Sequence, residues 1–383
     1  MAPPPTDAAG TPPPVEPPPV PSPAVAPSPY VPPPAAPAAA VPGPPPVPSS
    51  YVPSAIRGEV GDPFRSRADL SKLSAAVEAL RAEVGKLIVG QHALVDELIA
   101  ALLAGGHVLI EGVPGVAKTL TAKLLARATG LDYRRIQFTP DLMPSDVIGT
   151  SIYRPDGGVF EFHRGPIFAQ IVLIDEINRA PAKTQAALFE AMEERQVTVD
   201  GTTYTLEPPF QVLATQNPVE HEGTYRLPEA QLDRFLFKVR VGYPGLEDEV
   251  EILRRSQQQG GVLDTSLVHA VLTPADVREA QAAVRTIRVE EPVLRYAARI
   301  VAATRDHPAL YLGASPRASL ALLTGAKAVA AMSGRDFATP EDVRAIVAPA
   351  LRHRVVLTPE KEVEGVRPGT VLRRIVEEVE VPR

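Results

Sequence analysis

Between residues 68 and 105, apolar side chains return every three or four residues, which is the spacing of one face of an α-helix. The first series on this pattern is Leu70, Leu73, Val77, Leu80, Val84 and Leu87. A second helix is predicted over residues 91–103, after the short segment 88–91 interrupts the periodicity. The pattern therefore predicts two helices separated by a non-helical joint.

Apolar runs that suit buried strands alternate with helical segments further along the chain. The predicted strands are residues 108–110, 135–138, 171–174, 209–215 and 235–239. Residues 181–194 have a helical pattern. Continuous apolar runs are typical of strands covered on both faces, and their alternation with helices favours a parallel sheet. We therefore predict an α/β core over residues 68–270, with a mainly parallel sheet flanked by helices.

Two further segments have the pattern of β-hairpins. Residues 150–153 and 159–162 are joined across Gly157-Gly158, and residues 196–206 carry Asp200-Gly201 between β-branched arms. Asp-Gly is a preferred two-residue hairpin turn. Because a parallel sheet does not need these hairpins, we interpret them as functional projections.

From about Pro274 onward the pattern becomes helical, and Ala, Leu, Val and Arg dominate. The predicted helices are residues 274–286, 291–304, 315–332 and 340–351. These segments predict a separate small all-α domain over residues 271–383, although the last residues before Arg383 have no clear pattern.

Composition sets the first 60 residues apart from the rest. More than half of the 44 prolines lie there, among Ala, Val and Ser. Proline removes backbone donors and biases its neighbours toward extended conformations, which predicts a disordered arm over residues 1–60. Such an arm either docks on a proline-recognising or membrane-associated partner or serves as a solubilising tether, and we favour the tether.

Other global features exclude several classes of function. The sequence shows no N-terminal basic segment followed by an apolar core, so we expect no signal peptide. No apolar run approaches the ~18 residues of a membrane-spanning helix. The chain has no cysteine, which excludes disulfides and thiolate-bound zinc, and its seven histidines show no metal-ligand spacing. A net charge of −6 argues against a broad nucleic-acid-binding surface. We expect a cytoplasmic protein.

A glycine-containing segment follows the first predicted strand and leads into a helical pattern. It reads Gly112, Val113, Pro114, Gly115, Val116, Ala117, Lys118, Thr119 and Leu120. Its backbone N–H groups and the helix N-terminus would hold phosphates, Lys118 would neutralise them, and the Thr119 hydroxyl would bind Mg²⁺. Ala117 replaces the second glycine of the usual pattern, so an ordinary strand-to-helix turn is the competing interpretation.

A pair of carboxylates, Asp175 and Glu176, ends the apolar run at residues 171–174. Carboxylates at the C-terminal end of a buried parallel strand lie where α/β sheets bind ligands. Asp175 would hold Mg²⁺, and Glu176 would be the general base on the water that attacks the γ-phosphate. Solvated loop positions are the alternative, but the upstream loop favours a nucleoside triphosphate site.

Several motifs that occur in order resemble the MoxR branch of the AAA+ ATPases. They are the loop at residues 112–119 and the segments 137–146, 175–181, 214–218, 232–235 and 313–317. The resemblance covers roughly residues 70–355 and includes Ala117. It implies a P-loop AAA+ core followed by a helical lid domain, with ATP and Mg²⁺ as ligands.

The resemblance also implies roles for residues outside the loop. Asn217 would be the first sensor, which aligns the attacking water. Arg234 would be an arginine finger that reaches the γ-phosphate of a neighbouring subunit, and Arg317 would be the second sensor on the lid. Gly90 and Gln91 resemble the segment that lines the adenine pocket. Both hairpins resemble the helix-2 insert and the pre-sensor hairpin of the magnesium chelatase relatives.

Each of these roles has a simpler alternative. Asn217 precedes a proline and could be a turn residue. Arg234 could merely pair with Asp233 or Glu229. Arg317 lies near a predicted helix start, where a positive charge opposes the helix dipole unless an anion lies nearby. Arg179 could lie near a subunit interface, without a catalytic part.

The function implied by the resemblance is ATP hydrolysis that remodels or matures a partner complex. The implied assembly is a ring, by resemblance a hexamer, and the implied partner carries a von Willebrand A-type domain. A slow nucleotide-dependent binding switch and a DNA-dependent motor are the alternatives. The sequence does not name the client, the ring size or the part that the arm plays.

Overall fold

The computed structural model describes residues 70–156, 158–218, 225, 227–258, 260–261 and 263–382. The predicted proline-rich arm over residues 1–60 lies outside this part, as does Gly157 in the predicted Gly-Gly turn. The described residues belong to one compact unit, so the predicted boundary between core and lid at residue 270 stays a prediction.

The first two described helices follow the predicted periodicity. Helix α1 (Ser71–Gly85) buries Leu73, Val77, Leu80 and Val84, and helix α2 (His92–Ala104) follows after the joint. Helix α1 packs on α2, and the buried side chains of both helices belong to the core on one face of the central sheet.

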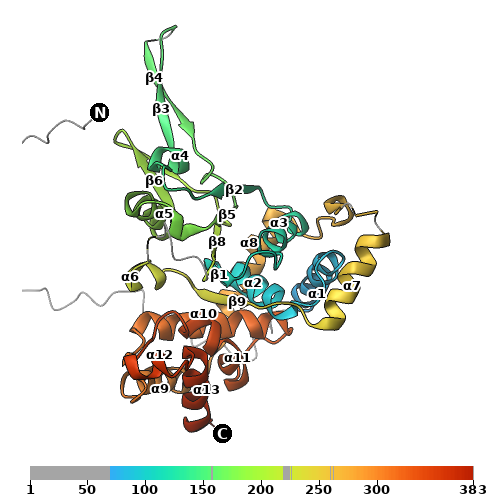
Figure 1. Cartoon of the computed structure of the whole chain (residues 1–383), viewed down its shortest axis with the longest axis vertical. Coiled ribbons are helices and arrows are strands. Elements are labelled where there is room, and N and C mark those ends of the chain that lie inside the picture. The colour runs from blue at the N-terminus through green and yellow to red at the C-terminus, as the bar shows by residue number, and fades with distance from the viewer. Residues whose placement is uncertain are drawn as a thin grey trace, which may run out of the picture. The chain divides into compact units, whose positions relative to one another are not determined.

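A parallel sheet forms the centre of the described chain (Figure 1). Its five strands, in spatial order, are β2 (Tyr133–Gln137), β5 (Ile171–Asp175), β8 (Gln211–Gln216), β1 (Val108–Gly112) and β9 (Phe237–Val241). Every neighbouring pair among these described strands is parallel. The α/β core is therefore confirmed, and the carboxyl ends of its strands meet at one edge.

Helices cover both faces of this sheet because side chains alternate along each strand. On β5, Ile171 and Leu173 belong to the core that includes α1, α2 and α3 (Lys118–Ala128). Val172 and Ile174 belong to the opposite core, which includes α4 (Pro144–Ile148) and α5 (Ala182–Glu194). Both faces of β5 are thus buried, as its unbroken apolar run predicted.

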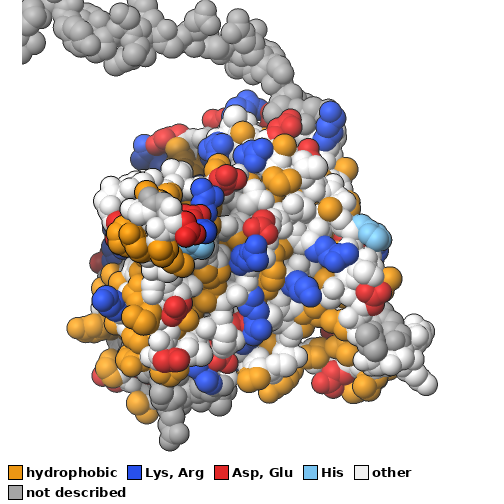
Figure 2. Space-filling view, turned by 90° about the horizontal axis from the view of Figure 1, so that it is seen from above, with side chains coloured by type: hydrophobic (Ala, Val, Ile, Leu, Met, Phe, Trp, Pro, Cys, Tyr) orange, Lys and Arg blue, Asp and Glu red, His pale blue; other side chains and the backbone are white. Residues whose placement is uncertain are grey.

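Both predicted hairpins are present and project from the core (Figure 1). The longer hairpin pairs β3 (Gly149–Arg154) with β4 (Val159–Arg164), and the shorter pairs β6 (Gln196–Val199) with β7 (Thr202–Thr205). Phe162 stacks on Tyr204 with ring centroids 4.3 Å apart, which links the two hairpins. On the longer hairpin, Tyr153 and Phe160 are 53% and 73% exposed. Figure 2 looks down on this end of the molecule and shows apolar side chains on its surface.

The C-terminal part is helical, as predicted. Its long helices are α8 (Pro274–Thr286), α9 (Glu291–Arg305), α10 (Pro316–Met332) and α11 (Pro340–Leu351). The pattern did not predict α12 (Pro359–Val363), α13 (Pro368–Glu378) or the short antiparallel pair β10 (Leu310–Leu312) and β11 (Val356–Leu357). Helix α10 packs on α2 of the core. Two elements, α6 (Glu229–Leu232) and α7 (Leu246–Gln258), flank β9.

None of the helices in the described part of the chain is both long and apolar enough to span a bilayer.

Candidate active site

The glycine-containing loop connects β1 to α3, which begins at Lys118. Gly115 and Ala117 both have positive φ, at 84° and 59°. An L-residue in this left-handed region costs about 1–2 kcal/mol, so Ala117 holds a conformation that glycine would adopt more easily. Ala117 therefore departs from the usual sequence pattern, but its backbone has the left-handed conformation that a glycine could adopt at this position.

The start of the loop is packed closely against β9. A Cβ atom at Gly112 would lie 2.7 Å from the backbone oxygen of Val241, so only glycine fits there without a shift. The Nζ of Lys118 donates a hydrogen bond to the backbone oxygen of Gly112. The side chain of Lys118 therefore folds back toward the start of the loop.

The joint between α1 and α2 lies against this loop. Gln91 donates a hydrogen bond from Nε2 to the backbone oxygen of Val116, at 3.0 Å. Its Oε1 is buried and has no hydrogen-bond partner. Gly90 has a φ of 66°, and a Cβ atom there would lie 2.5 Å from Oδ2 of Asp248. Gln91 therefore contacts the loop, and the part of Gly90 and Gln91 in lining an adenine pocket stays a prediction.

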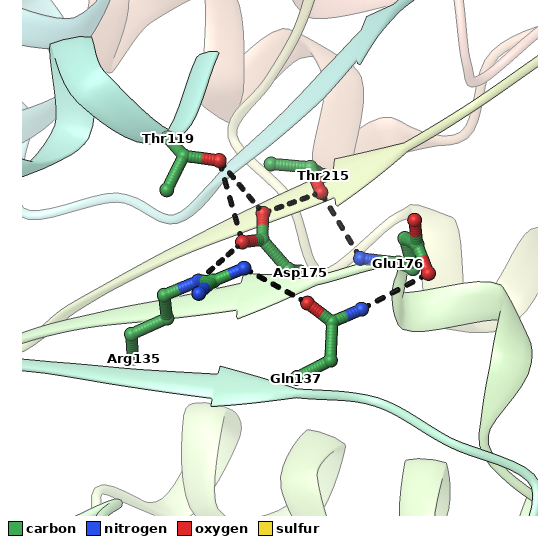
Figure 3. A network of polar contacts seen from close by, with 6 residues as sticks. All are labelled: Thr119, Arg135, Gln137, Asp175, Glu176 and Thr215. Atoms are coloured by element: carbon green, nitrogen blue, oxygen red, sulfur yellow. Dashed lines mark hydrogen bonds and ion pairs between the residues drawn. The ribbon is translucent and has the colours of Figure 1, made fainter. Parts of the chain in front are cut away.

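Asp175 is held at the carboxyl end of β5 by several donors (Figure 3). Its side chain accepts from Thr119 Oγ1 at 3.2 and 3.3 Å and from Thr215 Oγ1 at 3.0 Å. Arg135 on β2 donates from Nε to Oδ2 at 2.6 Å. Burial, followed by the charge of Asp175, raises the pKa of Tyr133 to about 12. The carboxylate is 5% exposed and therefore rigidly placed.

Glu176 follows directly and sits in a strained backbone conformation, with a φ of 57°. Its backbone N–H donates to Thr215 Oγ1 at 3.0 Å, and its Oε2 accepts from Gln137 Nε2 at 2.9 Å (Figure 3). Arg179 forms an ion pair with the same oxygen at 2.9 Å. Left-handed non-glycine residues cost free energy and cluster at functional sites, so this conformation singles out Glu176.

Asn217 follows β8 directly and is 7% exposed. Strand β8 lies between β5 and β1 in the sheet. Because these strands are parallel, Asn217 lies at the same sheet edge as Asp175 and Gly112.

Arg234 and Arg317 meet at a different place. Arg234 pairs with Glu193 Oε2 at 3.0 Å, and Arg317 pairs with Oε1 of the same carboxylate at 2.8 Å. Arg234 also donates from Nη1 to the backbone oxygen of Phe189 at 2.5 Å. Both arginines line a pocket of about 340 Å³. The nearby Asp233, the simpler partner considered for Arg234, is held instead by Arg354 at 2.6 Å.

This pocket lies at the amino-terminal edge of the sheet. His107, which precedes β1, lines the pocket, and its backbone oxygen accepts from Leu236 N at 2.8 Å. Strand β1 runs for five residues from there to Gly112. At about 3.3 Å per residue, the two edges are roughly 15 Å apart. Within one chain, Arg234 and Arg317 therefore belong to a region separate from that of Lys118 and Asp175.

Comparisons with known proteins place this geometry in a family. Residues 107–237 match the ATPase family associated with various cellular activities, and residues 302–375 match the AAA lid domain. The chain is 48% identical over 299 residues to the uncharacterized protein YeaC of Bacillus subtilis, covering 78% of this chain and 92% of YeaC. It is 46% identical over 310 residues to the chaperone MoxR1 of Mycobacterium tuberculosis, covering 79% and 81%. The chain belongs to the MoxR family of AAA+ ATPases.

A solved structure supports the fold of this MoxR-family chain. The crystal structure of a candidate ATPase from Cytophaga hutchinsonii matches it with a TM-score of 0.76 and 41% sequence identity. The match covers 82% of this chain and 97% of that protein. The AAA+ core and the lid are therefore both part of the shared fold.

Three residues of the MoxR-family site were not predicted from the sequence, namely Arg135, Gln137 and Thr215. Arg135 and Gln137 point from the neighbouring strand β2 toward the two carboxylates (Figure 3). Thr215 bridges Asp175 and the Glu176 backbone. A signal existed for Thr215 because it lies in the motif at residues 214–218. Gln137 likewise begins the motif at residues 137–146, whereas Arg135 needed the strand order, since the sequence does not say that β2 lies beside β5.

The donor set suits a metal ion that brings most of its own ligands. Among the described residues, no group of three or more His, Cys, Asp or Glu side chains could hold a metal. Thr119 and Asp175 offer a hydroxyl and carboxylate oxygens close together. Mg²⁺ is typically bound by one or two protein oxygens together with phosphates and waters. The residues present therefore fit Mg²⁺ rather than a metal in a protein cage.

Proposed function

We propose that this MoxR-family chain hydrolyses Mg·ATP and uses the cycle to remodel or mature a partner protein complex. The observation that carries the proposal is the convergence of Thr119, Asp175 and Glu176 at the edge where the phosphate loop begins. Phosphoryl transfer needs positioned charges more than covalent chemistry, and this edge supplies them.

Several groups suit the nucleotide itself. Loop N–H groups and Lys118 would hold the phosphates, with the start of α3 adding its dipole. The buried Oε1 of Gln91 has no partner and would accept a hydrogen bond from the adenine amino group. A buried acceptor without a partner costs free energy, so a ligand that satisfies it gains affinity.

Thr119 and Asp175 would hold Mg²⁺, which would neutralise charge on the phosphates. Glu176 would accept the proton of the attacking water, and Asn217 would orient that water. Gln137 and Arg179 hold Oε2 of Glu176 in the structure, so these two residues would position the base. Thr215 would fix the backbone on which the base stands.

Arg234 and Arg317 would act on the nucleotide of a neighbouring subunit. They lie at the sheet edge opposite to the loop, so they are badly placed for the nucleotide of their own chain. A contact between unlike faces of successive copies forms a ring when the rotation between copies closes, and an open filament when it does not. We propose a hexameric ring on family resemblance, with Arg234 as the finger and Arg317 as the sensor acting across the interface.

The exposed hairpins would contact the client, because Tyr153 and Phe160 present apolar surface away from the core. We propose a partner with a von Willebrand A-type domain and a location in the cytoplasm. Both proposals rest on the family resemblance.

Glu176→Gln tests the chemistry. Turnover should fall by about 10²- to 10⁴-fold, since a general base contributes roughly that much, while ATP affinity stays within about threefold. Steady-state phosphate release and calorimetric titration with ATP give the two quantities. Glu190→Gln, at an exposed position on α5, is the matched control and should match the parent. Unchanged turnover in Glu176→Gln would refute the assignment of the base.

The partner-directed part needs a separate measurement. A remodelling ATPase should hydrolyse faster with a von Willebrand A-type partner and change the assembly state of the complex that contains it. A slow binding switch would instead bind the partner in one nucleotide state with little turnover. Stimulation by DNA alone would favour the motor alternative and contradict the proposal.

A further inference from the structure

A second pocket lies between α11, α13 and the end of strand β9. Its volume is about 470 Å³. The charged side chains that line it are Arg240, Arg344, Arg352, Arg367, Arg373 and Glu377. No residue of the loop at 112–120 is among its described lining residues, so the pocket is separate from the candidate active site. Five guanidinium groups thus face one pocket with one carboxylate.

Within the described part of the chain, two of these five arginines have a hydrogen bond or ion pair. Arg240 donates from Nε to Glu111 Oε1 at 2.8 Å. Arg352 donates from Nε to the backbone oxygen of Ala348 at 2.9 Å, and burial lowers its pKa although Glu97 attracts the charge. The side chains of Arg344, Arg367 and Arg373 make no hydrogen bond or ion pair with any residue that the structure describes. Like charges that lie close together repel one another, and the single carboxylate of Glu377 does not balance five guanidinium groups.

The start of α13 adds to the positive potential. Arg367 is the N-cap of this helix, and the first turn carries no acidic residue to offset the dipole. A Cβ atom at Gly369 would meet nothing within 4 Å, so open space lies in front of this turn. The helix terminus and the arginines therefore act in the same direction on anything in the pocket.

We propose that this pocket binds an oligophosphate, a small molecule with several linked phosphate groups. Guanidinium groups pair with phosphate through two parallel hydrogen bonds, and several such forks around one cavity suit several phosphates. The pocket volume lies within the roughly 300–1,000 Å³ of small-molecule sites, so a compact ligand with several phosphates fits it. The proposal does not depend on the proposed ATPase cycle.

Calorimetric titration of the full chain with inorganic tripolyphosphate tests the proposal. Lys118→Ala serves as the background, because it weakens the competing phosphate loop. In this background, Arg344→Gln with Arg373→Gln should weaken binding by about a hundredfold, roughly tenfold for each charge-assisted contact. Both arginines are exposed and have no hydrogen-bond or ion-pair partner among the described residues, so the variants should keep the parent's thermal unfolding midpoint.

Arg374→Gln is the matched control. It removes the same charge from an exposed position on the same helix but does not line the pocket, so binding should stay within about twofold. Absence of binding at millimolar tripolyphosphate would overturn the proposal, as would equal binding by the parent and the Arg344/Arg373 double variant.

Further arms of the titration identify the source of the phosphates. If the affinities for ATP and for tripolyphosphate depend equally on Arg344 and Arg373, the ligand of this pocket is the phosphate tail of a nucleotide. If only the affinity for tripolyphosphate depends on these two arginines, the ligand is a free oligophosphate. Tighter, arginine-dependent binding of hexaglutamate or single-stranded DNA would overturn the assignment to an oligophosphate.

Discussion

The two edges of the central sheet carry charge in opposite ways. At the carboxyl edge, Asp175 and Glu176 are each surrounded by donors that balance and orient them. At the amino-terminal edge, two carboxylates face four arginines in one pocket. The arginines are Arg195, Arg234, Arg317 and Arg354, and the carboxylates are Glu193 and Asp233.

The proposed function would give each edge one half of a reaction centre. The carboxyl edge offers a frame for a cation and a base, whereas the amino-terminal edge has more cations than its carboxylates balance. Because about 15 Å of strand separates the edges, one chain cannot join its own halves without a large rearrangement. Two copies can join them, which is the physical argument for the proposed ring.

The largest expected effect comes from a substitution that removes an arginine from the amino-terminal edge and leaves the carboxyl edge intact. Arg234→Ala should lower turnover by about 10³-fold or more, in the range of arginine fingers, with ATP affinity almost unchanged. Phosphate release and ATP titration measure the two quantities. Arg234→Lys, which keeps the charge but loses the planar fork, should recover only part of the activity.

Mixing experiments decide whether Arg234 acts across the interface. Subunits with Arg234→Ala keep an intact carboxyl edge, and subunits with Glu176→Gln keep an intact arginine. Mixed rings should therefore regain activity that neither variant has alone. Failure to regain activity at every mixing ratio would contradict action in trans.

The next effect concerns His107, a buried residue at the amino-terminal edge. Its Nδ1 accepts from Val212 N at 2.9 Å, and its Nε2 contacts the backbone oxygen of Met192 beside Glu193 at 3.1 Å. Burial lowers the pKa of His107 from 6.5 to about 4. Between these values the unfolded chain binds a proton that the folded chain does not, so stability falls as pH decreases from 6.5 toward 4.

This shift corresponds to a loss of up to about 3 kcal/mol in the free energy of unfolding. Denaturant unfolding at pH 7 and pH 4.5 measures it. His107→Gln should show a smaller difference between the two pH values, whereas His92→Gln, at an exposed position, should behave like the parent. An unchanged pH dependence in His107→Gln would contradict the account.

The smallest effect sharpens the description of the carboxyl edge. Thr215→Val removes the hydroxyl that accepts from Glu176 N and donates to Asp175, so both groups lose a partner. Turnover should fall by about tenfold, since two hydrogen bonds worth about 0.5–1.5 kcal/mol each are lost. Thr215→Ser should restore most of it, and equal rates for both variants would show that Thr215 does not position the base.

The sequence predicted features that depend on local patterns. Apolar runs identified the strands, the Asp200-Gly201 pair identified the shorter hairpin, and the loop with its lysine identified the candidate nucleotide site. These features depend on neighbouring residues, so periodicity and turn chemistry are sufficient.

Long-range relations were not available in the same way. The strand order differs from the chain order, so Arg135 could not be placed against Asp175, forty residues away. Glu193 gave no signal, because an exposed glutamate at a helix end is ordinary until two distant arginines meet it. Helix α13 also lacked a clear pattern, although it buries Val371, Leu372, Ile375 and Val376.

In the isolated subunit, Glu193 would take the place of the phosphate that Arg234 and Arg317 are proposed to bind. Each of its carboxylate oxygens forms an ion pair with one guanidinium group, so both arginines are already paired with a negative charge. Joining a neighbour with its nucleotide would exchange one anion for another. The electrostatic gain on closing a ring is then only the difference between two pairings, which would leave subunit contacts reversible as nucleotide turns over.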